Sequence, residues 1–285
     1  MVIGKNKKEV IQNIKINTEN NELNKKVEVN DPVISDEEKT EVLEKFYKNK
    51  EKKISYFLKN KIGYLYVNYF SLKLNKSIEI EGLENIKDIN SSAIITTNHF
   101  NPLDNMVIRK LIKKRYKKNM YIVIQETNLL MPGFLGFLMN NLNILPLSKS
   151  PNYIIKKFKP ELSKILSKNN YVLIYPEEEM WFNYKKPRPC KRGSYQFAAE
   201  NNVPIISCFV EQIDTKEKDN DEFNKINYIV HVLKPIYPDK TKTPRENSII
   251  MAQLDYQQKV QAYEKAYNTK LSYDFSYDDI VGYRK

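Results

Sequence analysis

Glycine is scarce in this chain: only 7 of its 285 residues are glycine, and it has 2 cysteines and 2 histidines. It contains no Gly-rich phosphate loop, no dinucleotide-binding glycine pattern and no Gly-x-Ser-x-Gly nucleophile elbow. Cys190 and Cys208 form neither a Cys-x-x-Cys pair nor a zinc pattern with the histidines. We therefore expect free thiols in a reducing compartment and no metal site.

The chain also lacks a long apolar run. No stretch reaches the roughly 18 apolar residues that a membrane-spanning helix needs. The first five residues, Met-Val-Ile-Gly-Lys, contain no apolar core of signal-peptide length. These features predict a cytoplasmic protein, which can still lie on a membrane surface.

Positive charge is in excess, with a formal net charge of +12. A basic balance indicates an anionic partner, which can be a nucleic acid, a phosphorylated small molecule or a membrane surface. Lysines are scattered along the whole chain, however, and scattered lysines are also typical of an ordinary solvated surface. The hydrophobic fraction of 41% allows a substantial core, so a globular fold is expected.

The apolar segments of the central region resemble strands and alternate with helical patterns. The strand candidates are residues 77–81, 92–97, 120–125, 143–149, 171–177, 203–210 and 226–233. This alternation predicts an α/β domain over residues 76–242, with a mixed central sheet flanked by helices. His231 falls in the middle of the last strand and is interpreted as structural. A capping box at Thr243-Pro-Arg-Glu246 predicts a C-terminal helix and tail over 243–285.

Two segments precede the α/β domain. Residues 1–35 have no steady periodicity and are predicted to be a flexible or partly helical N-terminal arm. Residues 36–75 form an amphipathic helical segment with Ser35 as its N-cap, and its apolar and aromatic side chains recur every three or four residues among lysines. This pattern is typical of a helix at a membrane interface. An ordinary helix packed on the core has the same pattern, so both interpretations remain open.

The stretch from residue 92 to residue 104 runs from an apolar strand through a polar turn into a helix. His99 should lie at the C-terminal end of the strand, the edge where α/β proteins build their sites. We expect Asn101 to be the N-cap, Pro102 the first helical residue and Asp104 the third. Asp104 can orient the imidazole by accepting a hydrogen bond from it. Taken alone, an aspartate in this position is more often a helix-capping carboxylate than a catalytic one.

The residues Asn98-His-Phe-Asn-Pro-Leu-Asp104 resemble the Asn-His-x4-Asp signature of the glycerolipid acyltransferases, the family of the 1-acylglycerol-3-phosphate (lysophospholipid) acyltransferases. Three further blocks resemble the family and follow in its order: residues 143–149, Tyr175-Pro-Glu177 and Val203-Pro-Ile205. Together the blocks span about residues 92–210. The third block continues as Glu-Glu-Met-Trp-Phe-Asn-Tyr-Lys-Lys-Pro-Arg-Pro and is similar to that of a variant subgroup in low-GC Gram-positive bacteria.

The resemblance implies acyl transfer from acyl-CoA or acyl-carrier protein to the free hydroxyl of a lysophospholipid. The expected acceptor is 1-acyl-glycerol-3-phosphate, and the product is then phosphatidate. His99 is implied as the general base and Asp104 as the residue that orients it. No metal is implied, and no cofactor besides the acyl donor as co-substrate. The implied location is the inner face of the cell membrane, as a peripheral protein on an anionic surface, with no nucleic-acid partner.

The same resemblance suggests substrate-binding residues. Lys149 stands where the family has an arginine, and it is expected to bind the acceptor's phosphate as a point charge instead of a bidentate fork. Glu177 is expected to position the acceptor's head group. Arg188, Lys191 and Arg192 belong to a basic, aromatic loop and are candidates for phosphate contacts. The alternative for these three is a solvated basic loop.

The chain departs from the family pattern at several positions. Asn143 and Glu178 replace glycines of the second and third blocks, and Ser207 replaces a proline of the fourth. These departures leave a catalytically inactive relative that binds lipid or protein as the alternative function. A basic nucleic-acid-binding protein is a more remote alternative, suggested by net charge and abundant tyrosine.

Overall fold

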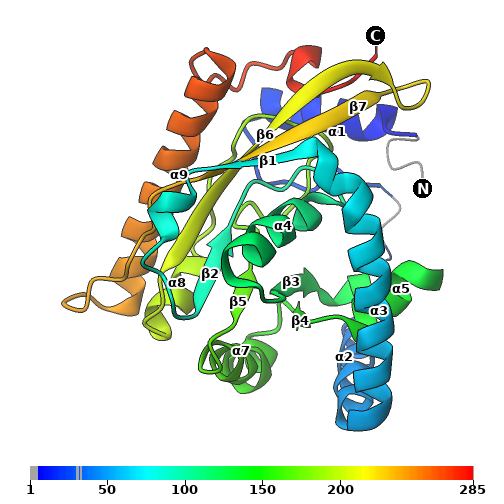
Figure 1. Cartoon of the computed structure of the whole chain (residues 1–285), viewed down its shortest axis with the longest axis vertical. Helices are drawn as coiled ribbons and strands as arrows, with labels where there is room; N and C mark the ends of the chain where they lie inside the picture. The colour runs from blue at the N-terminus through cyan, green and yellow to red at the C-terminus, as the bar shows by residue number, and fades with distance from the viewer. Residues whose placement is uncertain (1–5, 30–31, 33, 285) are drawn as a thin grey trace.

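A seven-stranded sheet in the order β1-β7-β6-β2-β5-β3-β4 forms the centre of the computed structural model, which describes residues 6–29, 32 and 34–284 (Figure 1). The strands are β1 (Ile78–Glu81), β2 (Ala93–Thr96), β3 (Tyr121–Gln125), β4 (Ile144–Leu147), β5 (Tyr171–Leu173), β6 (Ile205–Lys218) and β7 (Asn224–Val232). All neighbouring strands are parallel except β6 and β7, which are antiparallel. The predicted mixed sheet is therefore confirmed.

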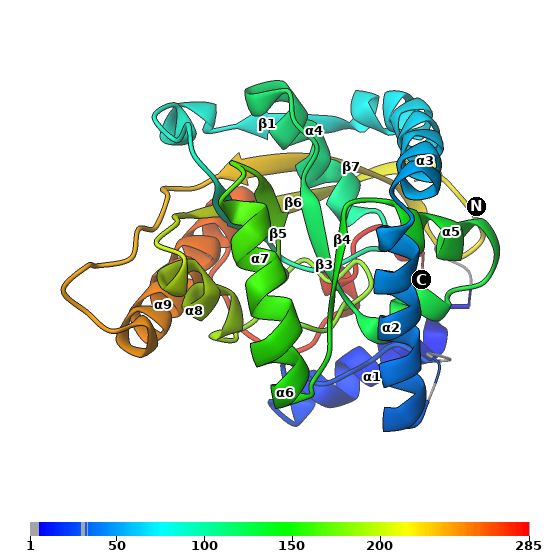
Figure 2. The same cartoon turned by 90° about the horizontal axis from the view of Figure 1, so that it is seen from below.

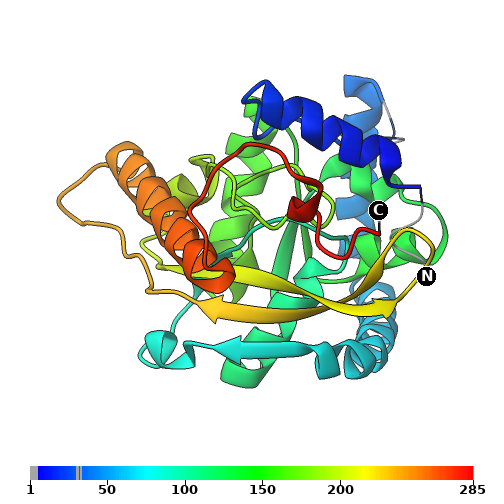
Figure 3. The same cartoon turned by 90° about the horizontal axis from the view of Figure 1, so that it is seen from above.

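Helices cover both faces of this sheet (Figure 2). The α-helices are α1 (Lys8–Glu19), α2 (Asp36–Glu51), α3 (Lys53–Leu74), α4 (Asp104–Tyr116), α5 (Gly133–Asn141), α6 (Pro151–Tyr153), α7 (Lys159–Leu166), α8 (Gly193–Glu200) and α9 (Pro244–Tyr267). Shorter turns are η1 (Asn75–Ser77), η2 (Leu83–Ile86), η3 (Glu126–Leu130), the π-helical η4 (Ile154–Phe158) and η5 (Tyr277–Asp279). In Figures 1 and 3, α3 and α9 lie on opposite sides of the molecule.

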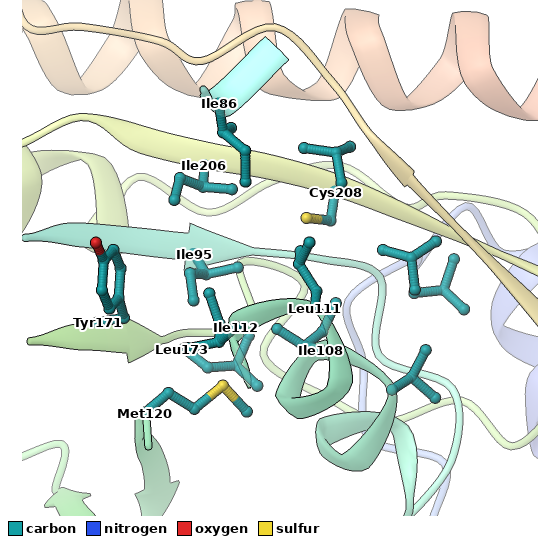
Figure 4. Close-up of a cluster of buried hydrophobic side chains, with 14 of the residues drawn as sticks. Ile86, Ile95, Ile108, Leu111, Ile112, Met120, Tyr171, Leu173, Ile206 and Cys208 are labelled. Carbon is teal, nitrogen blue, oxygen red and sulfur yellow. The ribbon is translucent and has the colours of Figure 1, made fainter. Parts of the chain in front are cut away.

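Strand β2 is buried on both faces, as expected for a central parallel strand. On one face Ile95 packs with Leu111 and Ile112 of α4 (Figure 4). On the other face Ile94 packs in a second cluster to which α7, α8 and α9 contribute. The strand is therefore held between two apolar layers, and the turn that follows it starts from a rigid element.

The helix starts predicted at Ser35 and Thr243 are confirmed. Ser35 begins α2 through a capping box with Glu38, and Thr243 begins α9 through a capping box with Glu246. In each box the hydroxyl accepts from the backbone of the third helical residue, and the glutamate accepts from the backbone of the cap. Two otherwise unpaired N–H groups are thereby satisfied at each helix start.

For the described part of residues 1–35, the structure confirms the helical alternative: a helix forms there and packs on the domain. Residues 8–19 form α1, whose Val10, Ile11 and Ile14 are buried with Trp181 and Phe182 in one apolar cluster. Figure 3 shows α1 lying across the same end of the molecule as the C-terminal tail. These apolar residues have no obvious period in the sequence. They are held in place because they pack against apolar side chains from distant parts of the chain. The prediction for residues 1–5, 30–31 and 33 lies outside the described residues.

Candidate active site

His99 and Asp104 are directly paired at the C-terminal edge of β2. The imidazole Nδ1 lies 2.6 Å from Asp104 Oδ2, and the aspartate is buried while the histidine side chain keeps 20% exposure. With Asp104 ionised, Nδ1–H donates to the carboxylate, and Nε2 is left as a proton acceptor. Within the described residues, Nε2 has no hydrogen-bond partner. This arrangement is that of a His–Asp general-base pair.

Helix α4 begins two residues later than the sequence indicated. Its first residue is Asp104, and Pro102 lies before it, so the expected helix start at Pro102 is wrong. Asn101 caps the turn instead, because its Oδ1 accepts from Leu103 N at 3.0 Å. Asp104 Oδ2 also accepts from the backbone N–H of Phe100 at 3.1 Å. The same carboxylate oxygen therefore caps the turn and binds the imidazole. Asp104 thus combines the capping role and the imidazole-orienting contact that the sequence left as alternatives.

Tyr175 is the third member of this cluster. Its ring stacks on the His99 imidazole, with 3.8 Å between ring centroids and 16° between the planes. Its hydroxyl donates to Asp104 Oδ1, the oxygen that the histidine does not use. Burial, and then the charge of Asp104, raise the pKa of Tyr175 well above its usual value. The hydroxyl therefore stays protonated and remains a donor to Asp104.

Glu177 and Arg188 form a buried ion pair around the backbone of His99. Their side chains are 2% and 1% exposed, and Arg188 Nη2 lies 2.8 Å from Glu177 Oε2. Glu177 Oε2 also accepts from His99 N at 3.1 Å, and Arg188 Nη2 donates to His99 O at 3.4 Å. Both residues were expected among those that bind the acceptor. The structure pairs them with each other, and a direct contact of either with substrate stays a prediction.

The segment after α1 contributes to this ion pair. Leu23 O accepts from Arg188 Nη1 at 3.2 Å, and Asn24 donates from its side chain to Glu177 O at 3.2 Å. Lys25 O accepts from the indole N–H of Trp181 at 2.9 Å. Residues 23–25 thus supply backbone and side-chain partners to a loop more than 150 positions away. No local sequence signal indicates this contact.

Asn98 fixes the turn on the other side of His99. Its side chain accepts from Val210 N at 2.8 Å and donates to Val210 O at 3.0 Å. These two bonds hold the turn after β2 against β6, using a side chain instead of the backbone. Ser207, a departure from the family pattern, donates to buried Asp255 of α9, which also accepts from Thr96 of β2. Serine at this position therefore ties β6 to α9.

The remaining predicted residues lie on the surface near the same edge of the sheet. Lys149 follows β4, the edge strand, and its side chain is exposed. Because β5 and β3 lie between β2 and β4, about 14 Å separates Lys149's strand from that of His99 at the usual strand spacing. Lys191 and Arg192 are exposed, and Lys191 N donates to Pro176 O at 2.7 Å, next to Glu177. Lys149 therefore comes from the end of β4, whereas Lys191 and Arg192 belong to the loop between β5 and α8.

Sequence reasoning missed Tyr175 and Asn98 as parts of the site, although both stand inside recognised blocks. The available signal was the hydroxyl of Tyr175, directly before Pro176 and Glu177 in the third block, which can donate a hydrogen bond. In the part of the chain that the structure describes, no group of three His, Cys, Asp or Glu side chains is arranged to hold a metal ion. Over the same residues, none of the helices combines the length and apolar character needed to cross a bilayer.

Residues 77–211 match the family model described as Acyltransferase, a segment just under half of the chain. The matched segment includes His99, Asp104 and every residue predicted to bind substrate. Among solved structures, the chain is similar to the 1-acyl-sn-glycerophosphate (LPA) acyltransferase PlsC from Thermotoga maritima. The identity is 17%, the alignment covers 81% of this chain and 88% of that chain, and the TM-score is 0.48. No curated protein matches the chain.

Proposed function

We propose that this protein transfers an acyl group from a thioester donor, acyl-CoA or acyl-carrier protein, to the free hydroxyl of a lysophospholipid. The observation that carries the proposal is the His99–Asp104 pair at the end of β2, with Nε2 free and the imidazole partly exposed. The acyltransferase match over residues 77–211 supports the same chemistry. The proposed acceptor is 1-acyl-glycerol-3-phosphate, and the product is phosphatidate.

In the proposed reaction, His99 Nε2 takes the proton of the acceptor hydroxyl while its oxygen attacks the thioester carbonyl carbon. The tetrahedral intermediate collapses by breaking the C–S bond, and the departing thiolate receives the proton from His99. One ester forms, one thioester is lost and one thiol is released, so no cofactor is consumed. Asp104 stabilises the imidazolium that forms between the two steps.

The direct test is an assay of the purified chain with lysophosphatidate and a labelled acyl donor. Acyl-CoA and acyl-carrier protein are supplied in separate reactions, and phosphatidate and free thiol are both measured. Equal amounts of ester and thiol are expected with at least one donor. Tight lipid binding without ester from either donor would favour the alternative, an inactive lipid-binding relative.

Lys149 is proposed to bind the acceptor's phosphate. Replacing Lys149 by glutamine should raise KM for lysophosphatidate by about tenfold and change kcat less, because a charge-assisted hydrogen bond is worth roughly 1.5–3 kcal/mol. Steady-state kinetics with varied acceptor measures this. Lys168 is a suitable control, because it is an exposed lysine after α7. An unchanged KM in Lys149→Gln would contradict the assignment.

Tyr175 is proposed to position the His99–Asp104 pair. Tyr175→Phe keeps the stacked ring and removes the hydroxyl that donates to Asp104. We expect kcat to fall by about tenfold, the cost of one hydrogen bond to a charged group, with KM for both substrates unchanged. Tyr195→Phe is the matched control, because it removes a buried hydroxyl that donates to Asp255 instead. Equal losses of kcat in the two variants would show a general packing effect.

The proposed location is the cytoplasmic face of the cell membrane, where α3 contacts the lipid surface. Helix α3 buries Tyr64 and Val67 against Leu43 and Phe46 of α2, so the two helices pack on the domain. The opposite side of α3 is apolar and exposed. We call it the α3 stripe: Ile54, Phe57, Leu58, Ile62, Leu65, Tyr66, Tyr69 and Leu72. An apolar patch of this extent on a basic protein supports an interface with anionic lipid.

The α3 stripe can be tested without disturbing the core. The double variant Leu65→Gln/Leu72→Gln should weaken partition onto anionic vesicles by about tenfold or more, because both side chains lose their favourable transfer into the acyl region. Vesicle sedimentation measures this. Ile250→Gln/Leu254→Gln on α9 is the control, since it removes two exposed apolar side chains on the opposite side. Equal partition of the two double variants would contradict the interface.

A further inference from the structure

A buried arginine without an acidic partner lies at the seam between α3 and α4. Arg109 of α4 is 6% exposed, and its guanidinium lies over the ring of Tyr64 at 4.6 Å. Nη2 donates to Asn68 Oδ1 and to Asn119 Oδ1, both at 3.1 Å. Nε is buried with no hydrogen-bond partner. Among the described residues, no carboxylate forms an ion pair with this guanidinium.

A second cation shares the same acceptor. Lys113, one turn further along α4, donates from Nζ to Asn68 Oδ1, so one neutral oxygen serves both side chains. Burial, and then the charge of Arg109, lower the pKa of Lys113. Buried charges are normally paired, because an unpaired charge loses its hydration without compensation. Two neighbouring cations that share a single neutral amide oxygen therefore form a site with uncompensated positive charge, which favours the binding of an anion.

This cation pair lies beside the α3 stripe and away from His99. Asn68 stands three residues after Leu65 and four before Leu72, so all three are neighbours on the surface of α3. Arg109 is five residues from Asp104 on α4, which places it about 140° around the helix axis from the catalytic side. A phosphate held here would lie at the border of an apolar surface, the depth at which lipid phosphates lie in a bilayer.

We propose that Arg109 and Lys113 bind the phosphate of an anionic phospholipid, whose oxygens replace Asn68 Oδ1 as their acceptor. The guanidinium presents parallel donors that suit phosphate geometry, and the ammonium adds a point charge. The lipid's acyl chains then continue along the α3 stripe. This site rests on the proposed membrane contact, and it adds a defined lipid-binding point that fixes how the enzyme is oriented on the surface.

The experiment measures partition of the full chain onto vesicles of phosphatidylcholine alone and with added phosphatidylglycerol. Lys113→Gln should weaken partition onto anionic vesicles by more than about tenfold, the effect of a charge-assisted hydrogen bond. Lys114→Gln removes an exposed charge next to it and should weaken partition by about fivefold at most, the general effect of one surface charge. On neutral vesicles the two variants should match the wild type. Equal losses in both on anionic vesicles would overturn the site.

Arg109 is tested in two variants, because removing a buried guanidinium can disturb packing. Arg109→Lys keeps a charge and should retain part of the anionic preference, whereas Arg109→Gln should lose it while showing an unchanged circular dichroism spectrum. Soluble glycerol 3-phosphate is added as a competitor and should not release the protein. If glycerol 3-phosphate releases the protein at concentrations near its dissociation constant for the free chain, the site binds soluble phosphate esters. That result would overturn the lipid assignment. Partition is measured without acyl donor, so its outcome is independent of acyl transfer.

Discussion

Replacing His99 by alanine should lower kcat for acyl transfer by about 10²–10⁴-fold, the contribution of a positioned general base. The loss should appear with both acyl donors, because proton removal from the acceptor precedes departure of either thiolate. KM for the acceptor should change little, since the imidazole is proposed to act on one proton and not on the head group. Initial rates of ester and thiol formation measure this effect.

Asp104→Asn provides the partner experiment. Asparagine keeps the size of the side chain but offers no charge to the imidazolium, so a comparable loss of kcat is expected. The kcat of the double variant should be no lower than that of the less active single variant, because the effects of residues that act as a unit are not additive. Both proteins must first show a wild-type melting temperature. Full activity of His99→Ala, or additive losses in the double variant, would contradict the mechanism.

Replacing Arg188 by methionine should lower the free energy of unfolding by about 3–5 kcal/mol, because Glu177 is left as a buried charge without its partner. The change also removes donors to Leu23 O and His99 O. For a chain of this size the melting temperature should fall by about 10 °C. Thermal and denaturant unfolding, followed by circular dichroism, measure both quantities.

Arg192→Met is the matched control on the same loop. Arg192 is exposed, and its loss should change stability by no more than about 0.5 kcal/mol. The comparison also separates two roles for Arg188. A structural role predicts lower stability and a lower kcat through displacement of His99. A phosphate contact predicts a higher KM for the acceptor with unchanged stability, and that outcome would contradict the structural role.

The centre of the site could be predicted from the sequence because its parts are close in the chain. The strand pattern before residue 98 and the polar turn after it placed His99 at a sheet edge, and five positions of spacing brought Asp104 within reach. The exact start of α4 was missed by two residues, since Asn101 caps a turn through Leu103 N and Asp104 accepts from Phe100 N before the helix begins. Local hydrogen bonds decide such a boundary, and several polar residues here compete for them.

The surroundings of the pair could not be predicted, because they depend on contacts between distant segments. Glu177 and Arg188 look like exposed ligands for a phosphate in the sequence, and the loop folds them inward as an ion pair. Residues 8–29 have no steady period in the sequence, and they pack on that same loop. In the sequence, a residue that is an exposed phosphate ligand has the same charge and the same neighbours as one that is a buried ion-pair partner. Only the position of the neighbouring segments decides whether a charged side chain faces solvent or a partner.

The sequence by itself therefore determined the class of fold, the His99–Asp104 pair and the amphipathic character of residues 36–75. These follow from periodicity and short spacing, which act within one element or one turn. Tertiary structure alone decided that Tyr175 stacks on His99, that the Glu177–Arg188 pair holds its backbone, and that Arg109 is buried without an acid. Each of those outcomes requires the desolvation of polar groups by segments far apart in the chain. No local pattern records where such segments meet.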